Sequence, residues 1–121
     1  MIVKLGPTLL SALVVVPAAR LLLGGWAVVT VENPPEALVA GVPYTIEYSV
    51  RQHGVSLLSG LKGRMEAATG SRVVRVDAKG GASTGRYSAA ITIPEPGDWT
   101  ITVHSGFGPS KTTLLPLKVT S

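Results

Sequence analysis

The sequence contains no cysteine, and this absence excludes several classes of site at once. A disulfide scaffold, a thiolate metal cluster, a covalently attached c-type haem and a type 1 copper centre all require cysteine. Charge is also scarce, at 15% of residues against about 25% in average soluble domains. Hydrophobic residues make up 45% of the chain, which excludes an intrinsically disordered protein. The length of 121 residues allows one folded domain.

The shortage of charge is concentrated near the N-terminus, where Lys4 and Arg20 are the only charged residues before Glu32. Residues 5–23 would span about 28 Å as a helix, close to the hydrocarbon thickness of a bilayer. We therefore predict that residues 1–25 form a membrane anchor, and the alternative is a secretory signal peptide. Both interpretations predict export. With an anchor, Lys4 on the short N-terminal side predicts a single-pass protein of the inner membrane whose C-terminal domain lies in the periplasm.

Residues 26–121 lack a helical period and instead alternate between polar and apolar residues in short segments separated by turns. This pattern is typical of strands in an antiparallel sandwich, and about 100 residues is the usual size of an immunoglobulin-like domain. We predict an all-β, seven-strand, immunoglobulin-like antiparallel sandwich preceded by one N-terminal transmembrane or signal helix. The predicted strands are 26–32, 43–52, 61–68, 72–78, 86–93, 98–104 and 111–120.

The alternation also predicts which side chains form the core. Tyr87 and Trp99 are assigned to it, whereas Glu47 and Glu66 point outward and are expected to be solvated. Pro116 lies inside the last predicted strand and indicates an edge position or a bulge. The residues of that strand expected to face inward are Leu115, Leu117 and Val119.

Four short motifs resemble a known group of proteins: Arg51-Gln52-His53-Gly54, the segment 58–62, Gly85-Arg86-Tyr87 and the segment 96–101. Over about residues 28–119 the sequence is similar to the YtkA-like and FixH-like small exported bacterial domains. This resemblance implies an immunoglobulin-like sandwich behind a signal or a single membrane helix. It also implies an association with membrane oxidases or with copper handling, and it supports the fold and the compartment more than an activity.

His53 and His104 are the only histidines, and the predicted strands that precede them end at the same end of the sandwich. A copper site needs two or three His or Met ligands held close together, and Met65 is the only methionine beyond the leader. His53, His104 and Met65 are therefore the candidate metal ligands. The favoured interpretation is that the two histidines form hydrogen bonds or an interface, with no cofactor bound.

The sequence shows no nucleophile–base arrangement, paired carboxylates or phosphate-binding loop, so we predict that the protein is not an enzyme. Nine basic and seven acidic residues follow residue 25, which is too small an excess to predict nucleic-acid binding.

The end of the sandwich where the first strand begins is the predicted interface. Leu57, Leu58 and Phe107 either cap the core or join a docking surface that faces the membrane. The full predicted interface is Trp26, Arg51, Val55, Leu57, Leu58, Phe107 and Lys111.

The leading hypothesis is a non-catalytic, membrane-anchored accessory subunit of a bacterial bioenergetic membrane complex: an oxidase, a cytochrome complex or a photosynthetic reaction centre. Its expected partners are an integral membrane protein complex and, through the N-terminal helix, the lipid bilayer. The alternative is a periplasmic copper-binding or copper-delivery module that uses His53 and His104. A third, weaker interpretation is an adhesion or carbohydrate-binding domain, although Tyr87 and Trp99 are assigned to the core rather than to an exposed aromatic platform.

Overall fold

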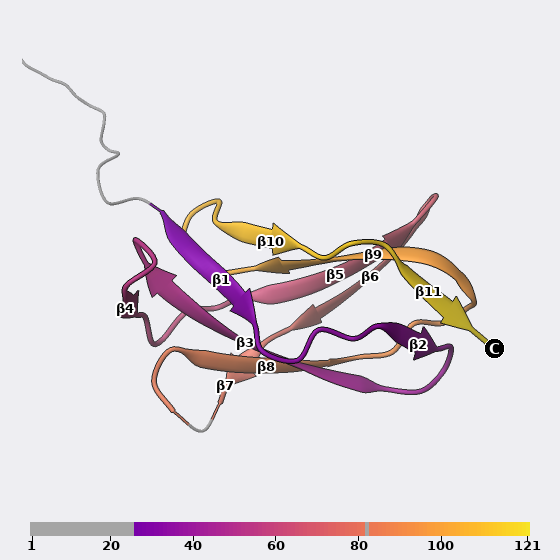
Figure 1. Cartoon of the computed structure of the whole chain (residues 1–121), viewed down its shortest axis with the longest axis horizontal. Helices are drawn as coiled ribbons and strands as arrows, with labels where there is room; N and C mark the ends of the chain where they lie inside the picture. The colour runs from indigo at the N-terminus through magenta and orange to yellow at the C-terminus, as the bar shows by residue number, and fades with distance from the viewer. Residues whose placement is uncertain (1–25, 82) are drawn as a thin grey trace, which may run out of the picture.

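The computed structural model describes residues 26–81 and 83–121, and in these residues the chain forms eleven strands and no helix. The strands make two sheets, so the all-β prediction and the two-layer prediction are confirmed (Figure 1). No helix within the described residues is long and apolar enough to cross a membrane. The predicted anchor or signal segment, residues 1–25, lies outside the described residues.

The first sheet, called sheet 1, is antiparallel throughout and follows the order β1-β3-β8-β7, with the short β4 paired to the end of β3. Its strands are β1 (Ala27–Val31), β3 (Tyr44–Gln52), β4 (Ser56–Leu57), β7 (Lys79–Gly80) and β8 (Arg86–Ile91).

The second sheet, called sheet 2, follows the order β2-β11-β9-β5-β6, with β10 also paired to β9. Its strands are β2 (Ala37–Val39), β5 (Arg64–Thr69), β6 (Arg72–Asp77), β9 (Gly97–His104), β10 (Lys111–Thr113) and β11 (Leu117–Thr120). The pairing of β2 with β11 is parallel, so the prediction of a fully antiparallel sandwich is wrong at this pair. The short strands β2, β4 and β7 were not predicted, because two or three residues are too few to show an alternation.

The core lies between the two sheets and consists of the inward rows that the alternation predicts. Ile46, Tyr48 and Val50 of β3 face Trp99 and Ile101 of β9, and none of the five is exposed to solvent. Fully burying one side chain of this kind contributes roughly 1.5–3 kcal/mol, so these rows supply the main driving force for folding. The indole Nε1 of Trp99 donates a hydrogen bond to the carbonyl of Glu95 at 3.1 Å, which satisfies the one polar atom of the largest core side chain.

The last predicted strand, 111–120, is interrupted. Thr113 pairs with Thr102 and Leu117 pairs with Trp99. Between these two pairs, the three residues 114–116 oppose the two residues 100–101 of β9. This extra residue is the bulge that Pro116 predicted, and it reverses the alternation. Leu117 is buried as expected, but the inward assignment of Leu115 is wrong, because its side chain is 84% exposed.

One end of the sandwich gathers the start of β1, the end of β3, β4 and the start of β10, while the C-terminus lies at the opposite end (Figure 1). Two hydrogen bonds join these segments. The His53 amide donates to the carbonyl of Trp26 at 3.2 Å, and the Ala27 amide donates to Ser110 Oγ at 2.9 Å. We call this end, made of segments 26–31, 49–63 and 105–113, the N-terminal pole. The strands leading to His53 and His104 end here, as predicted.

Candidate functional site

The N-terminal pole exposes apolar side chains that a self-contained domain would bury. Val55 is 76% exposed, Trp26 52%, Val28 41% and Leu57 37%. These are four of the eight large hydrophobic residues that are exposed in the described part of the chain. Scattered exposed hydrophobic residues are normal, whereas a group gathered at one end is a candidate contact surface.

The strand register arranges part of this cluster in a row on the outer face of sheet 1. Val28 pairs with Arg51, and Arg51 pairs with Leu57 across β1, β3 and β4. The side chains of Val29 and Val50 point into the core, so those of their neighbours Val28 and Arg51 point outward. The row therefore has a basic side chain between two apolar ones.

Gly85 allows the chain to pass close beneath this row. Its φ of 74° lies in the left-handed region, and a Cβ at this position would come 2.6 Å from the Cβ of Leu57. A glycine is required here on both counts, because other residues rarely adopt this φ and the space is filled.

The tip of the pole is a tight turn that brings His53 against Trp26. The two ring centroids lie 5.1 Å apart with the planes tilted by 47°. His53 has a φ of 53°, an uncommon conformation for a residue with a side chain, and Gly54 follows with a φ of 75°. His53 therefore takes part in the turn and in the contact with Trp26.

A core tyrosine holds the loop that follows β4. The Tyr87 hydroxyl donates to the carbonyl of Leu58 at 2.6 Å and accepts from the amide of Leu61 at 3.2 Å. Leu58 is half-buried and packs against the core, so it caps the sandwich rather than extending the exposed cluster. Phe107 is also half-buried, and its amide donates to Ser105 Oγ at 2.8 Å.

The charges of the pole are all of one sign. Its three segments contain no Asp or Glu, and their basic residues are Arg51, Lys62 and Lys111. Both lysines are exposed, whereas Arg51 is half-buried and its Nη1 donates to Ser49 Oγ at 3.3 Å. Among the predicted interface residues, the structure thus places exposed apolar and exposed basic side chains at the same end.

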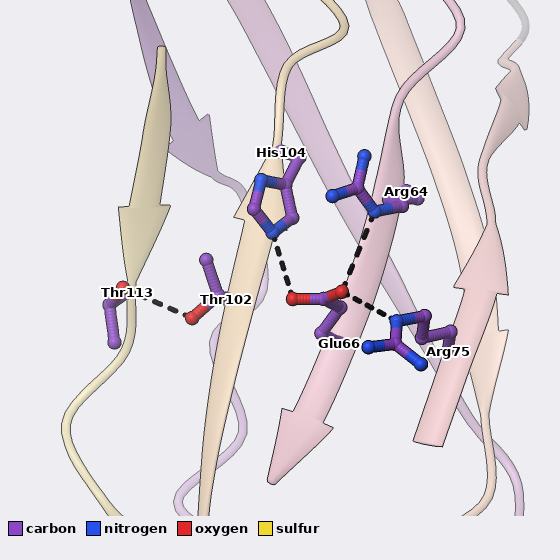
Figure 2. A network of polar contacts seen from close by, with 6 residues as sticks. All are labelled: Arg64, Glu66, Arg75, Thr102, His104 and Thr113. Carbon is purple, nitrogen blue, oxygen red and sulfur yellow. Dashed lines mark hydrogen bonds and ion pairs between the residues drawn. The ribbon is translucent and has the colours of Figure 1, made fainter. Parts of the chain in front are cut away.

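A second group of polar side chains, whose interactions the sequence analysis missed, lies on the outer face of sheet 2. Figure 2 shows Glu66 of β5 between two arginines and a histidine, which come from β5, β6 and β9. Arg75 Nε donates to Glu66 Oε2 at 2.8 Å, Arg64 Nε lies 3.6 Å from the same oxygen, and His104 Nε2 lies 3.1 Å from Glu66 Oε1. Beside them the hydroxyls of Thr102 and Thr113 are 3.1 Å apart. We call these six residues the charged face.

This arrangement lowers the pKa of Glu66 from 4.5 to about 2, because the hydrogen bond from Arg75 stabilises the carboxylate and His104 adds to it. The prediction that Glu66 is a simple solvated carboxylate is therefore wrong. Its partners lie on neighbouring strands, and only the register brings Arg75 opposite Glu66. The signal that could have revealed it is the pairing of an outward acid with outward basic residues on adjacent predicted strands.

The structure does not unite the three candidate metal ligands. Met65 is fully buried in the core, while His104 lies on the outer face of the same sheet and contacts Glu66. Met65 is thus corrected from a candidate ligand to a core residue, because adjacent positions along a strand point to opposite faces. His53 contacts Trp26 instead. The described residues contain no group of three or more His, Cys, Asp or Glu that could hold a metal ion.

The core contains a polar atom that its surroundings do not satisfy. The hydroxyl of Tyr48 is buried and has no hydrogen-bond partner among the described residues, although its ring stacks on Tyr87 with centroids 5.5 Å apart. Burial raises the pKa of Tyr48 to about 12, with the Tyr87 hydroxyl as a second cause. The two stacked tyrosines therefore differ sharply, because only the hydroxyl of Tyr87 is bonded.

Comparison with known proteins gives only distant structural likenesses. No family model matches the chain, and no curated protein does either. Among solved structures, the chain is similar to a superoxide reductase (neelaredoxin) from Ignicoccus hospitalis. The two share 16% sequence identity with a TM-score of 0.48, over 76% of this chain and 79% of that chain. No residue role is carried over at this level of similarity, and the resemblance to YtkA-like and FixH-like domains stays a prediction.

Proposed function

We propose that this protein is a non-catalytic, membrane-attached accessory subunit that docks on an integral membrane protein complex through its N-terminal pole. The observation that carries the proposal is the exposure of Trp26, Val55 and Leu57 at the end where the apolar segment 1–25 joins the domain. An exposed apolar cluster marks a contact surface. Its position beside a segment of membrane-spanning composition directs that surface toward the membrane.

The location follows from the same features. Residues 1–25 are proposed to attach the protein to the inner membrane in a single pass, with the sandwich in the periplasm. The bioenergetic character of the partner, an oxidase, a cytochrome complex or a photosynthetic reaction centre, rests on the resemblance to YtkA-like and FixH-like domains alone.

We infer further that the sandwich belongs to the immunoglobulin-like class. The order β1-β3-β8-β7 corresponds to strands A-B-E-D of that fold, and β11-β9-β5 corresponds to G-F-C. The hydrogen bond from Trp99, near the start of β9, back to Glu95 resembles the corner that a tyrosine forms at this place in immunoglobulin domains. A binding role without catalysis is common in this class, although a fold alone does not define a function.

Affinity purification from native membranes tests the proposal. The full chain carrying a C-terminal tag is extracted in a mild detergent, and stoichiometric membrane proteins are identified by mass spectrometry. We expect one membrane complex to copurify with the wild type and with Val73→Glu, which changes an exposed valine on β6, and to be lost with Val55→Glu. A monodisperse chain without a partner, or a partner that Val55→Glu retains, contradicts the proposal.

The copper alternative has less support, because Met65 is buried and His104 contacts Glu66. Copper titration of the wild type, His53→Ala and His104→Ala by calorimetry decides it. We expect no copper binding with a Kd below about micromolar, which corresponds to a binding free energy of roughly −8 kcal/mol. Tighter binding that both variants lose would restore the alternative.

A further inference from the structure

The domain is joined to the apolar segment by a very short connection. Residues 5–23 contain one charge, Arg20, and only Gly24 and Gly25 separate Leu23 from Trp26. An extended chain advances at most about 3.6 Å per residue, so the three steps from Leu23 to Trp26 cover about 10 Å. If residues 5–23 lie in a bilayer, the N-terminal pole must therefore lie at or near its headgroup region, because no longer tether is available.

The side chains at the pole suit this layer. Trp26 is amphipathic and exposed, and tryptophan is enriched at the boundary between lipid and water. Val55 is the most exposed of the large apolar residues of the pole and lies in the turn that follows β3. In the row on sheet 1, the basic Arg51 lies between the apolar Val28 and Leu57, so this row combines positive charge with apolar side chains.

The charge distribution supports a particular kind of lipid. The three segments of the pole contain no carboxylate, and Lys62 and Lys111 are exposed on them. One acid lies close to this end: Asp77 of β6 lines a hollow beside Lys62, whereas β5 and β9 separate it from Lys111 at the start of β10. Basic residues close to a bilayer are attracted by anionic headgroups within about one Debye length, roughly 10 Å at 0.1 M salt.

We propose that the N-terminal pole binds the surface of an anionic lipid bilayer directly. Trp26 and Val55 enter the headgroup layer, and Lys62 and Lys111 face the lipid phosphates. This inference rests on the membrane attachment in the proposed function and adds that the pole contacts lipid even without a protein partner. The contact would fix the orientation of the sandwich before it meets the complex.

Because the chain has no cysteine, a single introduced thiol can be labelled cleanly. The full chains of Val55→Cys and the control Val73→Cys are labelled with an environment-sensitive fluorophore. They are then reconstituted into nanodiscs of phosphatidylcholine, with or without phosphatidylglycerol. Compared with the phosphatidylcholine discs, the anionic discs should shift the emission of the label at position 55 to the blue. In the anionic discs, lipid-borne quenchers should also quench this label at least twofold more strongly. The label at position 73 should not change.

Two further measurements separate the possible outcomes. Raising the salt to about 0.5 M, or changing Lys62 and Lys111 to Glu in the labelled chain, should abolish the difference between the two lipids. A label at position 55 that is as exposed to water in the anionic discs as the label at position 73 overturns the lipid contact, and leaves a protein as the occupant of the pole. A label at position 55 that is equally shielded in both kinds of disc overturns the role of the anionic headgroups. A chain that enters neither kind of disc overturns membrane attachment itself, and with it both proposals. The partner purification is independent, because the nanodiscs contain no other protein.

Discussion

The N-terminal pole and the charged face are both exposed surfaces, yet they meet solvent in opposite ways. On the charged face, Glu66 is surrounded by Arg64, Arg75 and His104, so the charges of neighbouring strands compensate one another. At the pole, Val55 and Trp26 are exposed, and the segments around them contain no acid to balance their basic residues.

This difference separates a surface that stabilises the domain from a surface that is available to a partner. The charged face satisfies its own polar groups, so a partner would have to break contacts that already exist. The pole leaves apolar area exposed, and its own segments contain basic residues and no acid. Variants on the charged face should therefore alter stability, and variants at the tip of the pole should alter binding.

The largest effect is expected from the tyrosine that holds the base of the pole. Tyr87→Phe removes the hydroxyl that bonds both Leu58 and Leu61, and should lower the free energy of unfolding by about 1–3 kcal/mol. Tyr48→Phe is the matched control, because its hydroxyl has no partner among the described residues and its removal should leave stability unchanged or raised. Denaturant unfolding of both variants measures this. Equal losses in the two would show that the bonds to the loop contribute nothing.

The next effect concerns the charged face at neutral pH. Glu66→Gln removes the charge shared by Arg64, Arg75 and His104, and should cost about 1 kcal/mol, since the group is partly exposed. Glu47→Gln, on the outer face of sheet 1, should change stability by less than about 0.5 kcal/mol. Thermal unfolding at pH 7 compares the two, and a Glu66→Gln variant as stable as the control would contradict the role of the charged face.

The same carboxylate predicts an acid dependence. Its pKa is lowered in the folded state, so its stabilising contribution is present above pH 4.5 and is lost as the pH falls toward 2. The wild type should therefore lose its advantage over Glu66→Gln across this range. Unfolding followed by circular dichroism at several pH values measures the difference, and an advantage that stays constant down to pH 2 would exclude the lowered pKa.

The smallest effect on stability is expected at the tip of the pole. Val55→Ser changes a side chain that is mostly exposed, so the free energy of unfolding should move by no more than about 0.5 kcal/mol. The same variant should weaken capture of the membrane complex. A stability loss as large as that of Tyr87→Phe would instead identify Val55 as part of the packing of the domain, and the comparison between the two surfaces would fail.

Much of the core could be predicted from the sequence because strand periodicity is local. Trp99 and Tyr87 are buried as their alternation indicated, and Pro116 correctly marked a bulge. The orientation of Leu115 could not be obtained in this way, because one inserted residue reverses the alternation at a place that the sequence does not specify. The pairing of β2 with β11 was also hidden, since a parallel contact between distant short segments leaves no local pattern.

The residues of the candidate site show the same distinction between local patterns, which the sequence reveals, and contacts between distant strands, which it does not. The sequence predicted Trp26, Val55 and Leu57 as interface residues, and the structure exposes all three, while the interface itself stays a prediction. The sequence analysis missed the hydrogen bonds of Glu66, and it wrongly grouped Met65 with the histidines. Both errors arose because the contacts of a side chain depend on the face of the sheet on which it lies and on the strands beside it.

By itself the sequence determined the all-β class, most of the inward rows and the concentration of apolar residues before the domain, because composition and two-residue periodicity are properties of consecutive residues. Only the tertiary structure decided which residues of distant strands meet. The register placed Arg75 and His104 around Glu66, buried Met65 away from them, and brought Trp26 against His53 at the pole. Such contacts depend on pairing between strands far apart in the chain, and no local pattern encodes that pairing.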